Sequence, residues 1–280
     1  MALVNLKAVL QKAQEENYAV CAFNIENMEM AQAIISAAEE YRSPVILQTT
    51  PSTLRYAEPG LFFAIVNALA QQTDVPVVMH LDHGNSFELT SKAFRSGYTS
   101  VMIDGSKLPL QENVMLTKAV VSMCHPAGVS VEAEIGCIGG KEDDLTGDNM
   151  YTVPEEAKLL AEQTRVDALA VAIGTAHGVY KSKPVLNMER LKEIRALVDA
   201  PLVLHGTSGI SDAVVRECIA NGICKVNYAT DLRIAFTHGA NRVLEDKAVY
   251  DPKKYMAEGR KEVKEYAAAR MVACGSSNRV

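Results

Sequence analysis

The feature that most constrains this chain is a series of eight short apolar segments, each followed by a longer segment with helical periodicity. The short segments are continuously apolar and rich in Val, Ile and Ala, as is typical of parallel strands that are covered on both faces. They occupy residues 19–25, 44–50, 76–82, 99–105, 129–135, 167–173, 200–206 and 224–230. Eight such units predict an α/β protein, a (β/α)8 TIM barrel.

An open, doubly wound sheet is the alternative arrangement of the same units. That fold usually carries a glycine-rich phosphate loop after its first strand, and residues 22–29 read AFNIENME, without G-x-G-x-x-G. Pro and Gly fall singly at turns, so we expect one domain over 1–280. Helices are expected at 27–42 and 187–199, and the segment of about 251–280 is expected to add a C-terminal helix.

Composition excludes several kinds of partner. The formal net charge of −6 argues against nucleic acid, which favours basic surfaces. Six cysteines without a CxxC pair indicate reduced thiols, and the N-terminus is too charged for a signal peptide. No apolar run is long enough to span a bilayer. We therefore expect a soluble cytoplasmic protein that binds neither nucleic acid nor membrane.

Polar residues gather at the carboxyl ends of the predicted strands. In a barrel these ends meet at one mouth, where the active sites of this fold lie. Random placement would scatter such residues along the strands. The residues concerned are Asn24, Thr49, Thr50, Asp82, His83, Asp104, Glu132, Glu134, His177, His205 and Asn227.

Three of these residues are histidines from three separate strands: His83, His177 and His205. Three neutral imidazoles with an open fourth position form a catalytic zinc site. Each alone would more often be a structural histidine, but their joint position favours a metal centre. His80 lies mid-strand, near enough to support a ligand, and the remaining histidines, His125 and His238, are expected to be structural.

The carboxylates near the histidines have two possible duties. Asp82 precedes His83 and should point differently, because strand side chains alternate. It could orient a histidine or act as general base on a substrate hydroxyl. Asp104 and Glu134 fit better as groups that orient the ligands or as alternative metal ligands.

Two segments are suited to bind phosphate, and a third is suited to cover it. HGTSG (205–209) and NYATD (227–231) each end a strand just before a helix, where small residues and backbone N–H groups form anion sites. Either segment alone would be an ordinary turn. EIGCIGGKEDDLTGDN (134–149) is expected to be a mobile loop that closes over substrate with an acid, or else a solvated surface loop. The acids in question are Glu142, Asp143 and Asp144.

These motifs together resemble the class II, zinc-dependent ketose-bisphosphate aldolases. HLDHG, EAEIG-x-x-GG-x-ED, AIGTAHGVY, LHG-x-SG and KVN-x-AT occur in order over nearly the whole chain. Within this family the chain is most similar to the tagatose-1,6-bisphosphate aldolases. The fructose enzymes usually have aspartate where this chain has Ala229.

The resemblance implies a role for each matching residue. His83, His177 and His205 match the Zn²⁺ ligands, and Asp82 matches the acid/base at the C4 hydroxyl. Glu142 matches the glutamate that moves a proton at the dihydroxyacetone-phosphate carbon. The remaining matches are Asn227, which contacts the enediolate, and the C1-phosphate cradle of Gly178, Gly206, Ser208 and Thr230, often with Na⁺ or K⁺.

The resemblance also implies a homodimer or homotetramer, in which Arg279 of the C-terminal tail reaches its own or a neighbouring active site. The expected substrate is tagatose 1,6-bisphosphate or fructose 1,6-bisphosphate, cleaved to dihydroxyacetone phosphate and glyceraldehyde 3-phosphate. Four departures from the family pattern are expected to line the substrate site: Ser52, Arg55, Thr207 and Tyr228. They leave open an alternative, 6-deoxy-6-sulfofructose 1-phosphate, which would yield sulfolactaldehyde.

Three other classes rank below this hypothesis. A Schiff-base aldolase needs a strand lysine, and Lys225, the one candidate, lies at the start of its predicted strand. A non-catalytic partner subunit would have no use for Asp82, Glu142 and three histidines. A zinc hydrolase would not need two phosphate cradles.

Overall fold

The structure, a computed structural model, describes the whole chain except residues 1–2, 143–144, 148–150 and 179–183. The side chains of residues 140–142 and 145–147 also lie outside the description. Eight parallel strands close into a barrel in the order β1-β11-β10-β8-β5-β4-β3-β2. Their bounds are β1 Val20–Asn24, β2 Val45–Thr49, β3 Val77–Gly84, β4 Ser100–Ile103, β5 Ser130–Ile135, β8 Ala168–Val171, β10 Leu202–Leu204 and β11 Ile223–Tyr228. The predicted TIM barrel is confirmed, and every predicted strand is present.

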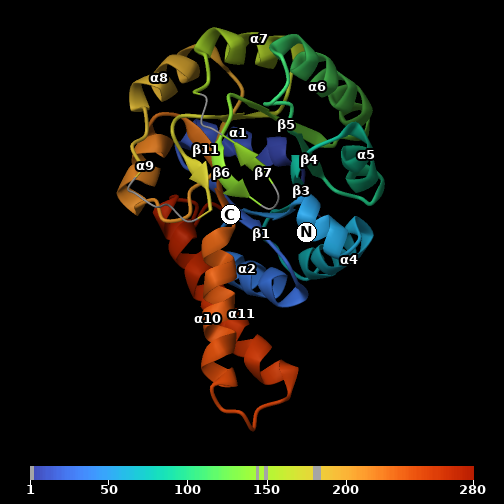
Figure 1. The fold of residues 1–280 in the computed structure, drawn as a ribbon, viewed down its shortest axis with the longest axis vertical. Helices are drawn as coiled ribbons and strands as arrows, with labels where there is room; N and C mark the ends of the chain where they lie inside the picture. Colours follow the sequence, from blue (N-terminus) through green and yellow to red (C-terminus); the bar gives the residue numbers. More distant parts are fainter. Residues whose placement is uncertain (1–2, 143–144, 148–150, 179–183) are drawn as a thin grey trace.

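Helices surround the barrel, as Figure 1 shows. Many begin at a side-chain cap that the sequence supplies, such as Asn27 for α2 and Asn187 for α8, each of which accepts from a backbone N–H three residues on. The helices are α1 Leu6–Glu16, α2 Met28–Glu40, α3 Pro51–Tyr56, α4 Pro59–Ala70, α5 Phe87–Arg95, α6 Leu110–Cys124, α7 Pro154–Thr164, α8 Met188–Leu197, α9 Asp212–Ala220, α10 Thr230–Leu244 and α11 Pro252–Ala273, with a short 3-10 helix at His125–Ala127.

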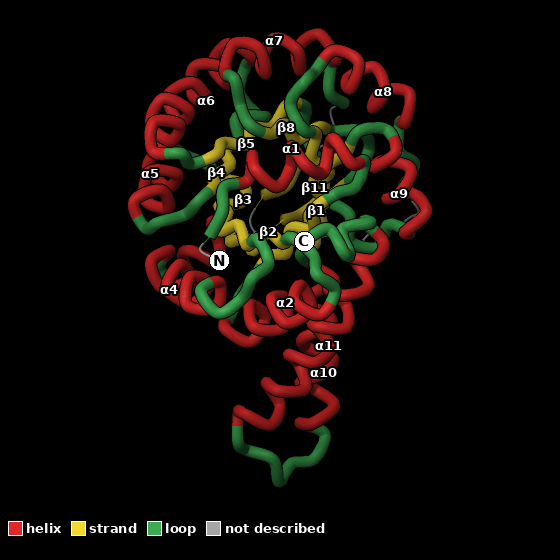
Figure 2. The backbone as a smooth tube through the Cα atoms, turned by 180° about the vertical axis from the view of Figure 1, so that it is seen from behind, coloured by secondary structure: helices red, strands yellow, loops and turns green. Residues whose placement is uncertain are grey.

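The barrel interior is apolar near the end where the strands begin and polar toward the end where they finish. Inward residues near the start of the strands, among them Val20, Ala22 and Ile46, pack against Leu6 and Leu10 of α1. Helix α1 lies across this end of the barrel and closes it (Figure 2). Polar chemistry is therefore confined to the opposite end, where the carboxyl ends of the strands lie.

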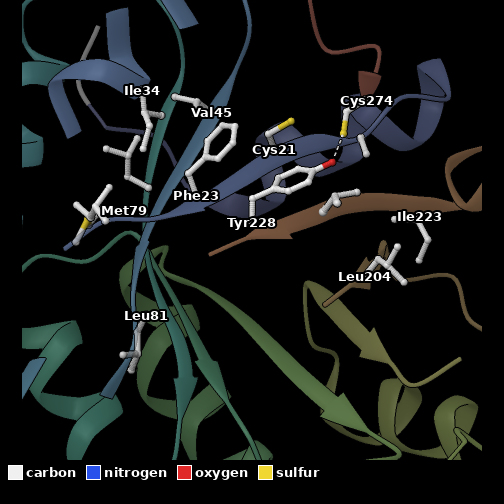
Figure 3. Packing of buried hydrophobic residues seen from close by; sticks show 14 of the residues in the cluster. Cys21, Phe23, Ile34, Val45, Met79, Leu81, Leu204, Ile223, Tyr228 and Cys274 are labelled. Carbon is white, nitrogen blue, oxygen red and sulfur yellow. Dashed lines mark hydrogen bonds between the residues drawn. The ribbon is translucent and has the colours of Figure 1, made fainter. Parts of the chain in front are cut away.

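A second apolar layer fills the space between the strands and the outer helices. It is formed by the outward-facing strand residues, such as Phe23 and Val45, and by the inner faces of helices, such as Ile34 of α2 (Figure 3). This layer holds each strand in place from outside. The side chains at the mouth consequently stand on a rigid frame.

The C-terminal helix is part of a larger feature than the sequence predicted. Helix α11 confirms the helix expected after residue 251, but α10 packs along it, and the pair extends away from the barrel (Figure 1). Among the described residues, no helix is long and apolar enough to cross a membrane.

A small second sheet, absent from our prediction, lies outside the barrel. It consists of β6 Gly139–Glu142, β7 Leu145–Gly147 and β9 Ala176–His177, in the order β7-β6-β9. Strands β6 and β7 are antiparallel, and β6 runs parallel to β9, with Gly140 opposite His177. The segment expected to form a loop after β5 is therefore a hairpin in register with one of the candidate ligands.

Candidate active site

Three histidines meet at the mouth of the barrel. His83 lies near the end of β3, His177 ends β9, and His205 follows β10. Each offers a ring nitrogen, and these three nitrogens lie within 4.8 Å of one another. Nδ1 of His205 lies 2.9 Å from Nε2 of His83. This donor set suits a divalent metal such as zinc.

A local irregularity of β3 directs His83 into the site. The pairing of β3 with β4 shifts between Leu81 and Gly84, and His83 has a left-handed backbone with φ +49°. A Cβ atom on Gly84 would overlap the carbonyl of Met102, so this turn requires glycine. Such strain in a non-glycine residue is characteristic of functional sites.

Two carboxylates orient the rings. Oδ2 of Asp104 lies 3.1 Å from Nδ1 of His83, which leaves Nε2 to face the other histidines. Oε1 of Glu132 lies 3.0 Å from Nε2 of His205, which leaves Nδ1 to face them. Asp104 was predicted in this duty. For Glu132 the sequence indicates only a polar residue at a strand end, and nothing in it points to the pairing with His205.

Glu132 forms a fully buried ion pair with Lys225 in the barrel interior. Nζ of Lys225 lies 2.9 Å from Oε2 of Glu132, and Nε2 of His80 lies 3.5 Å from the same oxygen. Burial acts to raise the pKa of Glu132, but the Lys225 ammonium and the His205 hydrogen bond outweigh it and hold that pKa well below its usual range. Burial and the same ammonium lower the pKa of His80, which also bonds Ser100.

Lys225 lies near the start of β11, as the sequence predicts, and its side chain lies in the barrel interior. The pairing of β10 with β11 skips one residue, so Val203 lies opposite Lys225 while Leu202 lies opposite Ile223. This bulge turns Lys225 inward toward Glu132.

A second group of candidate ligands overlaps the first. His83, Asp104 and Glu134 also offer donor atoms within 4.8 Å of one another. Oε2 of Glu134 lies 3.8 Å from Nδ1 of both His83 and His205. Burial and the carboxylate of Asp104 raise the pKa of Glu134. These positions fit the prediction that Asp104 and Glu134 support the ligands or replace one of them.

Asp82 lies beside the histidines and faces the other side of the mouth. Nδ2 of Asn24 and Nε2 of Gln48 donate to Oδ2 at 2.9 and 3.1 Å, and Nδ2 of Asn227 donates to Oδ1 at 3.1 Å. The donors come from β2, β1 and β11, whereas His83 faces β4 and β10. Three amides therefore fix the orientation of one carboxylate that is only 1% exposed.

The predicted phosphate segments form one small hollow. Gly206 makes it possible: its φ is +65°, and a Cβ atom would press on the carbonyl of Ala176. The hydroxyl of Thr207 donates to the carbonyl of Asn227 and joins the two segments. The hollow is lined by His177, Gly178, Gly206, Thr207, Ser208, Asn227, Ala229 and Thr230.

Asp231 joins the hollow to the C-terminal helix. Its Oδ2 accepts from the backbone N–H of Gly209 at 3.2 Å and from the hydroxyl of Tyr266 at 3.0 Å. The backbone N–H of Asp231 donates to Oγ of Ser208 at 3.4 Å. The hollow therefore combines backbone N–H groups, small side chains and a helix N-terminus, the features of an anion site.

Two predicted substrate residues lie elsewhere. Tyr228 is 1% exposed and points out of the barrel, where it packs on Phe23 and Tyr266 and contacts Sγ of Cys274 at 3.3 Å (Figure 3). Strand side chains alternate, so Tyr228 must face outward because Asn227 faces inward. The assignment of Tyr228 to the substrate site is wrong.

For Arg279, only the expectation that it reaches the active site of its own chain is wrong, and its reach to a neighbouring site stays a prediction. Arg279 bonds Glu16 at 3.0 Å and stacks on Tyr18, both of which precede β1 at the closed end of the barrel. Within this chain Arg279 therefore fastens the C-terminus and does not reach the mouth. The tail returns beneath the barrel, a path that no local sequence pattern indicates.

The remaining predicted residues lie on elements at the mouth. Ser52 and Arg55 belong to α3, directly after β2, and Oγ of Ser52 lies 3.2 Å from Oγ1 of Thr50. Glu142 ends β6, but its side chain lies outside the described residues, as do Asp143 and Asp144. The roles of these residues stay predictions.

The fold and the site together define a class: a barrel enzyme with three histidines placed to hold a metal, a carboxylate beside them and a hollow with the features of an anion site. Residues 4–279 match the family model described as fructose-bisphosphate aldolase class-II. The chain belongs to this family, and it is a metal-dependent aldolase, a carbon–carbon lyase.

Solved structures agree with this assignment. The YdjI aldolase from Escherichia coli K12 is 36% identical, with 99% of each chain covered and a TM-score of 0.88. A putative fructose-1,6-biphosphate aldolase from Coccidioides immitis is 28% identical, covering 98% of this chain and 97% of that one, with a TM-score of 0.89. The fold is shared with fructose-bisphosphate aldolase from Campylobacter jejuni, which is 24% identical. That comparison covers 100% of this chain and 97% of that one, with a TM-score of 0.83.

Proposed function

We propose that this enzyme cleaves a ketose 1-phosphate between C3 and C4, releasing dihydroxyacetone phosphate and an aldehyde, with Zn²⁺ held by His83, His177 and His205. The observation that carries the proposal is the convergence of three imidazole nitrogens within 4.8 Å beside a carboxylate held by three amides. A zinc ion held there would polarise the ketose carbonyl and stabilise the negative charge that develops on bond cleavage.

Asp82 is the base in this proposal. Its two oxygens accept hydrogen bonds from Asn24, Gln48 and Asn227, so the carboxylate keeps one orientation and presents a lone pair to the C4 hydroxyl. It removes the proton of that hydroxyl as C3 and C4 separate. General base catalysis of this kind contributes about 10²- to 10⁴-fold.

The hollow lined by Gly206, Ser208 and Thr230 would hold the C1 phosphate. Phosphate binding there would place the first carbon of the substrate beside His177 and the C4 hydroxyl at Asp82. Oδ1 of Asn227, a buried atom with no hydrogen-bond partner among the described residues, is available to a substrate hydroxyl. Glu142 would protonate the dihydroxyacetone-phosphate carbon, and a bound Na⁺ or K⁺ would assist the phosphate.

Tagatose 1,6-bisphosphate and fructose 1,6-bisphosphate are the proposed substrates, and Ala229 favours the former. The sulfonate alternative rested partly on Tyr228, which lies outside the mouth. The decisive measurement is release of dihydroxyacetone phosphate from both bisphosphates and from 6-deoxy-6-sulfofructose 1-phosphate, with and without chelator. Cleavage that a chelator abolishes and Zn²⁺ restores supports the proposal. A zinc-loaded enzyme that cleaves none of the three would contradict it, and sedimentation would test the expected dimer or tetramer.

A further inference from the structure

One charged cluster at the mouth has no part in the chemistry described above. Glu26, Thr53 and Arg233 come from the segments that follow β1, β2 and β11. Oε1 of Glu26 accepts from Nε of Arg233 at 2.8 Å and lies 2.7 Å from the second guanidinium nitrogen. Oε2 of Glu26 accepts from the hydroxyl of Thr53 at 2.7 Å. Both charged side chains are partly exposed, Glu26 at 29% and Arg233 at 36%.

The position of this cluster relates it to the far end of the substrate. The three strands that lead to it are those whose amides hold Asp82: Asn24 of β1, Gln48 of β2 and Asn227 of β11. Because parallel strands all run toward the mouth, residues that follow these amides lie outward from Asp82. The cluster therefore occupies the outer layer on the Asp82 side of the mouth.

The phosphate hollow lies on a different arc of the barrel. Its lining follows β9, β10 and β11, whereas the cluster spans β11, β1 and β2, the next strands in the barrel order. A ketose with its C1 phosphate in the hollow and its C4 hydroxyl at Asp82 would direct C5 and C6 toward Glu26. This step rests on the proposed function.

We propose that Glu26 tunes specificity for the aldehyde half of the substrate. It raises the KM for an aldehyde with a terminal phosphate, which the proposed bisphosphates yield, relative to that for an uncharged, hydroxyl-bearing aldehyde, and it does not exclude the phosphate. The carboxylate of Glu26 forms an ion pair with the guanidinium of Arg233, the group that would otherwise bind a phosphate best. The same carboxylate adds a negative charge, which repels a phosphate. Hydroxyl groups, in contrast, can donate to the lone pairs of Glu26.

The buried lining on this side of the mouth agrees with hydroxyl recognition. Oε1 of Gln48 is buried and has no hydrogen-bond partner among the described residues, while Nε2 of the same amide donates to Asp82 and to Asn24. A buried carbonyl oxygen of this kind needs a donor, which a hydroxyl supplies and a phosphate dianion does not.

Aldol addition of dihydroxyacetone phosphate to D-glyceraldehyde and to D-glyceraldehyde 3-phosphate tests the proposal on the zinc-loaded enzyme. Glu26→Gln keeps the shape of the side chain and an acceptor for Thr53 but removes the charge. We expect the KM for the phosphorylated aldehyde to fall about tenfold, with kcat little changed and the KM for D-glyceraldehyde within about twofold. High salt should reduce the gain, because it screens the exposed guanidinium.

Two further variants make the test specific. Arg233→Gln leaves the charge of Glu26 uncompensated, so the KM for the phosphorylated aldehyde should rise while that for D-glyceraldehyde stays near its original value. Glu40→Gln breaks a comparable exposed pair, that of Glu40 with Lys264 at 2.8 Å on α2 and α11, and should alter neither KM.

Equal shifts for both aldehydes in Glu26→Gln, or no shift for either, would overturn the assignment of Glu26 while leaving the aldolase proposal intact. Failure of the unmodified enzyme to add dihydroxyacetone phosphate to either aldehyde would overturn the proposed function and this inference with it.

Discussion

Nε2 of His205 lies 3.0 Å from Oε1 of Glu132, and Nδ1 of the same ring lies 2.9 Å from Nε2 of His83. The two nitrogens of His205 therefore have different duties. Glu132, an ionised carboxylate beside Lys225, accepts a hydrogen bond from the Nε2–H group, so the lone pair of the neutral ring is on Nδ1, facing the other histidines. Orientation and tautomer of one candidate ligand are set by a residue that cannot itself reach the open mouth.

Removal of the Glu132 charge should weaken metal binding. Glu132→Gln retains an acceptor for His205 but a poorer one, and we expect zinc affinity to fall about 10- to 100-fold. Competition with a coloured chelator measures the zinc affinity of each variant. Asp167→Asn is the matched control, because Asp167 accepts from His125 at 2.9 Å outside the site and should leave zinc affinity unchanged. Equal affinities in both variants would contradict the role of Glu132.

The Lys225–Glu132 pair should also contribute to folding in a way that depends on both partners. Lys225→Met leaves a buried carboxylate without its cation, and breaking such a pair costs about 3–5 kcal/mol in the free energy of unfolding. The double variant Lys225→Met/Glu132→Gln removes both charges and should recover most of that loss. Urea denaturation of the zinc-free proteins measures the cycle. Additive losses would show that the two charges act independently.

Asp82 should be required for turnover and dispensable for metal binding. Asp82→Ala removes the group that takes the C4 hydroxyl proton, and we expect kcat for ketose cleavage to fall about 10²- to 10⁴-fold. Zinc content should stay the same, whereas His205→Ala should lose the metal. Metal analysis and a dihydroxyacetone-phosphate assay on the same samples separate the two effects. Normal turnover by Asp82→Ala would remove it as the base.

Strand-end chemistry made much of this site predictable from the sequence. A residue that ends a parallel strand of a barrel must lie at the mouth, whatever its neighbours are, and this rule placed Asp82, His83 and His205 together. The same rule brought Gly206 and Thr230 into one hollow. These predictions needed only strand positions and chain direction.

Features that bulges or the path of the chain decide could not be predicted. The bulge before Lys225 turns that side chain inward, and one-residue shifts of this kind leave no mark in an apolar run. Arg279 returns to Glu16 beneath the barrel through a tertiary contact that no pattern near the C-terminus indicates. For Tyr228 the sequence does contain the answer, because alternation from the inward-facing Asn227 requires Tyr228 to face outward.

Buried thiols should make the fold sensitive to high pH. Burial raises the pKa of Cys124 and of Cys218 to about 12, from an ordinary value of 9.0. A folded-state pKa above the unfolded one contributes stability that is fully present below pH 9 and is lost as the pH rises toward 12. Thermal unfolding at pH 8, 9.5 and 11 should show a falling Tm. Cys124→Ala should flatten that fall, and an identical slope in the variant would exclude Cys124 as a contributor.

Replacement of Gly206 should be more harmful than replacement of Gly128, although both glycines have a left-handed backbone. Gly206 has φ +65° and Gly128 has φ +72°, but only at Gly206 would a Cβ atom meet another atom within 4 Å, the backbone of Ala176. Gly128→Ala should cost about 1 kcal/mol for the left-handed conformation alone. Gly206→Ala adds the displacement of Ala176 and of the adjoining His177. We therefore expect a larger loss of stability together with a raised KM for dihydroxyacetone phosphate in the addition reaction. Similar unfolding free energies and an unchanged KM would show that this close approach does not shape the phosphate hollow.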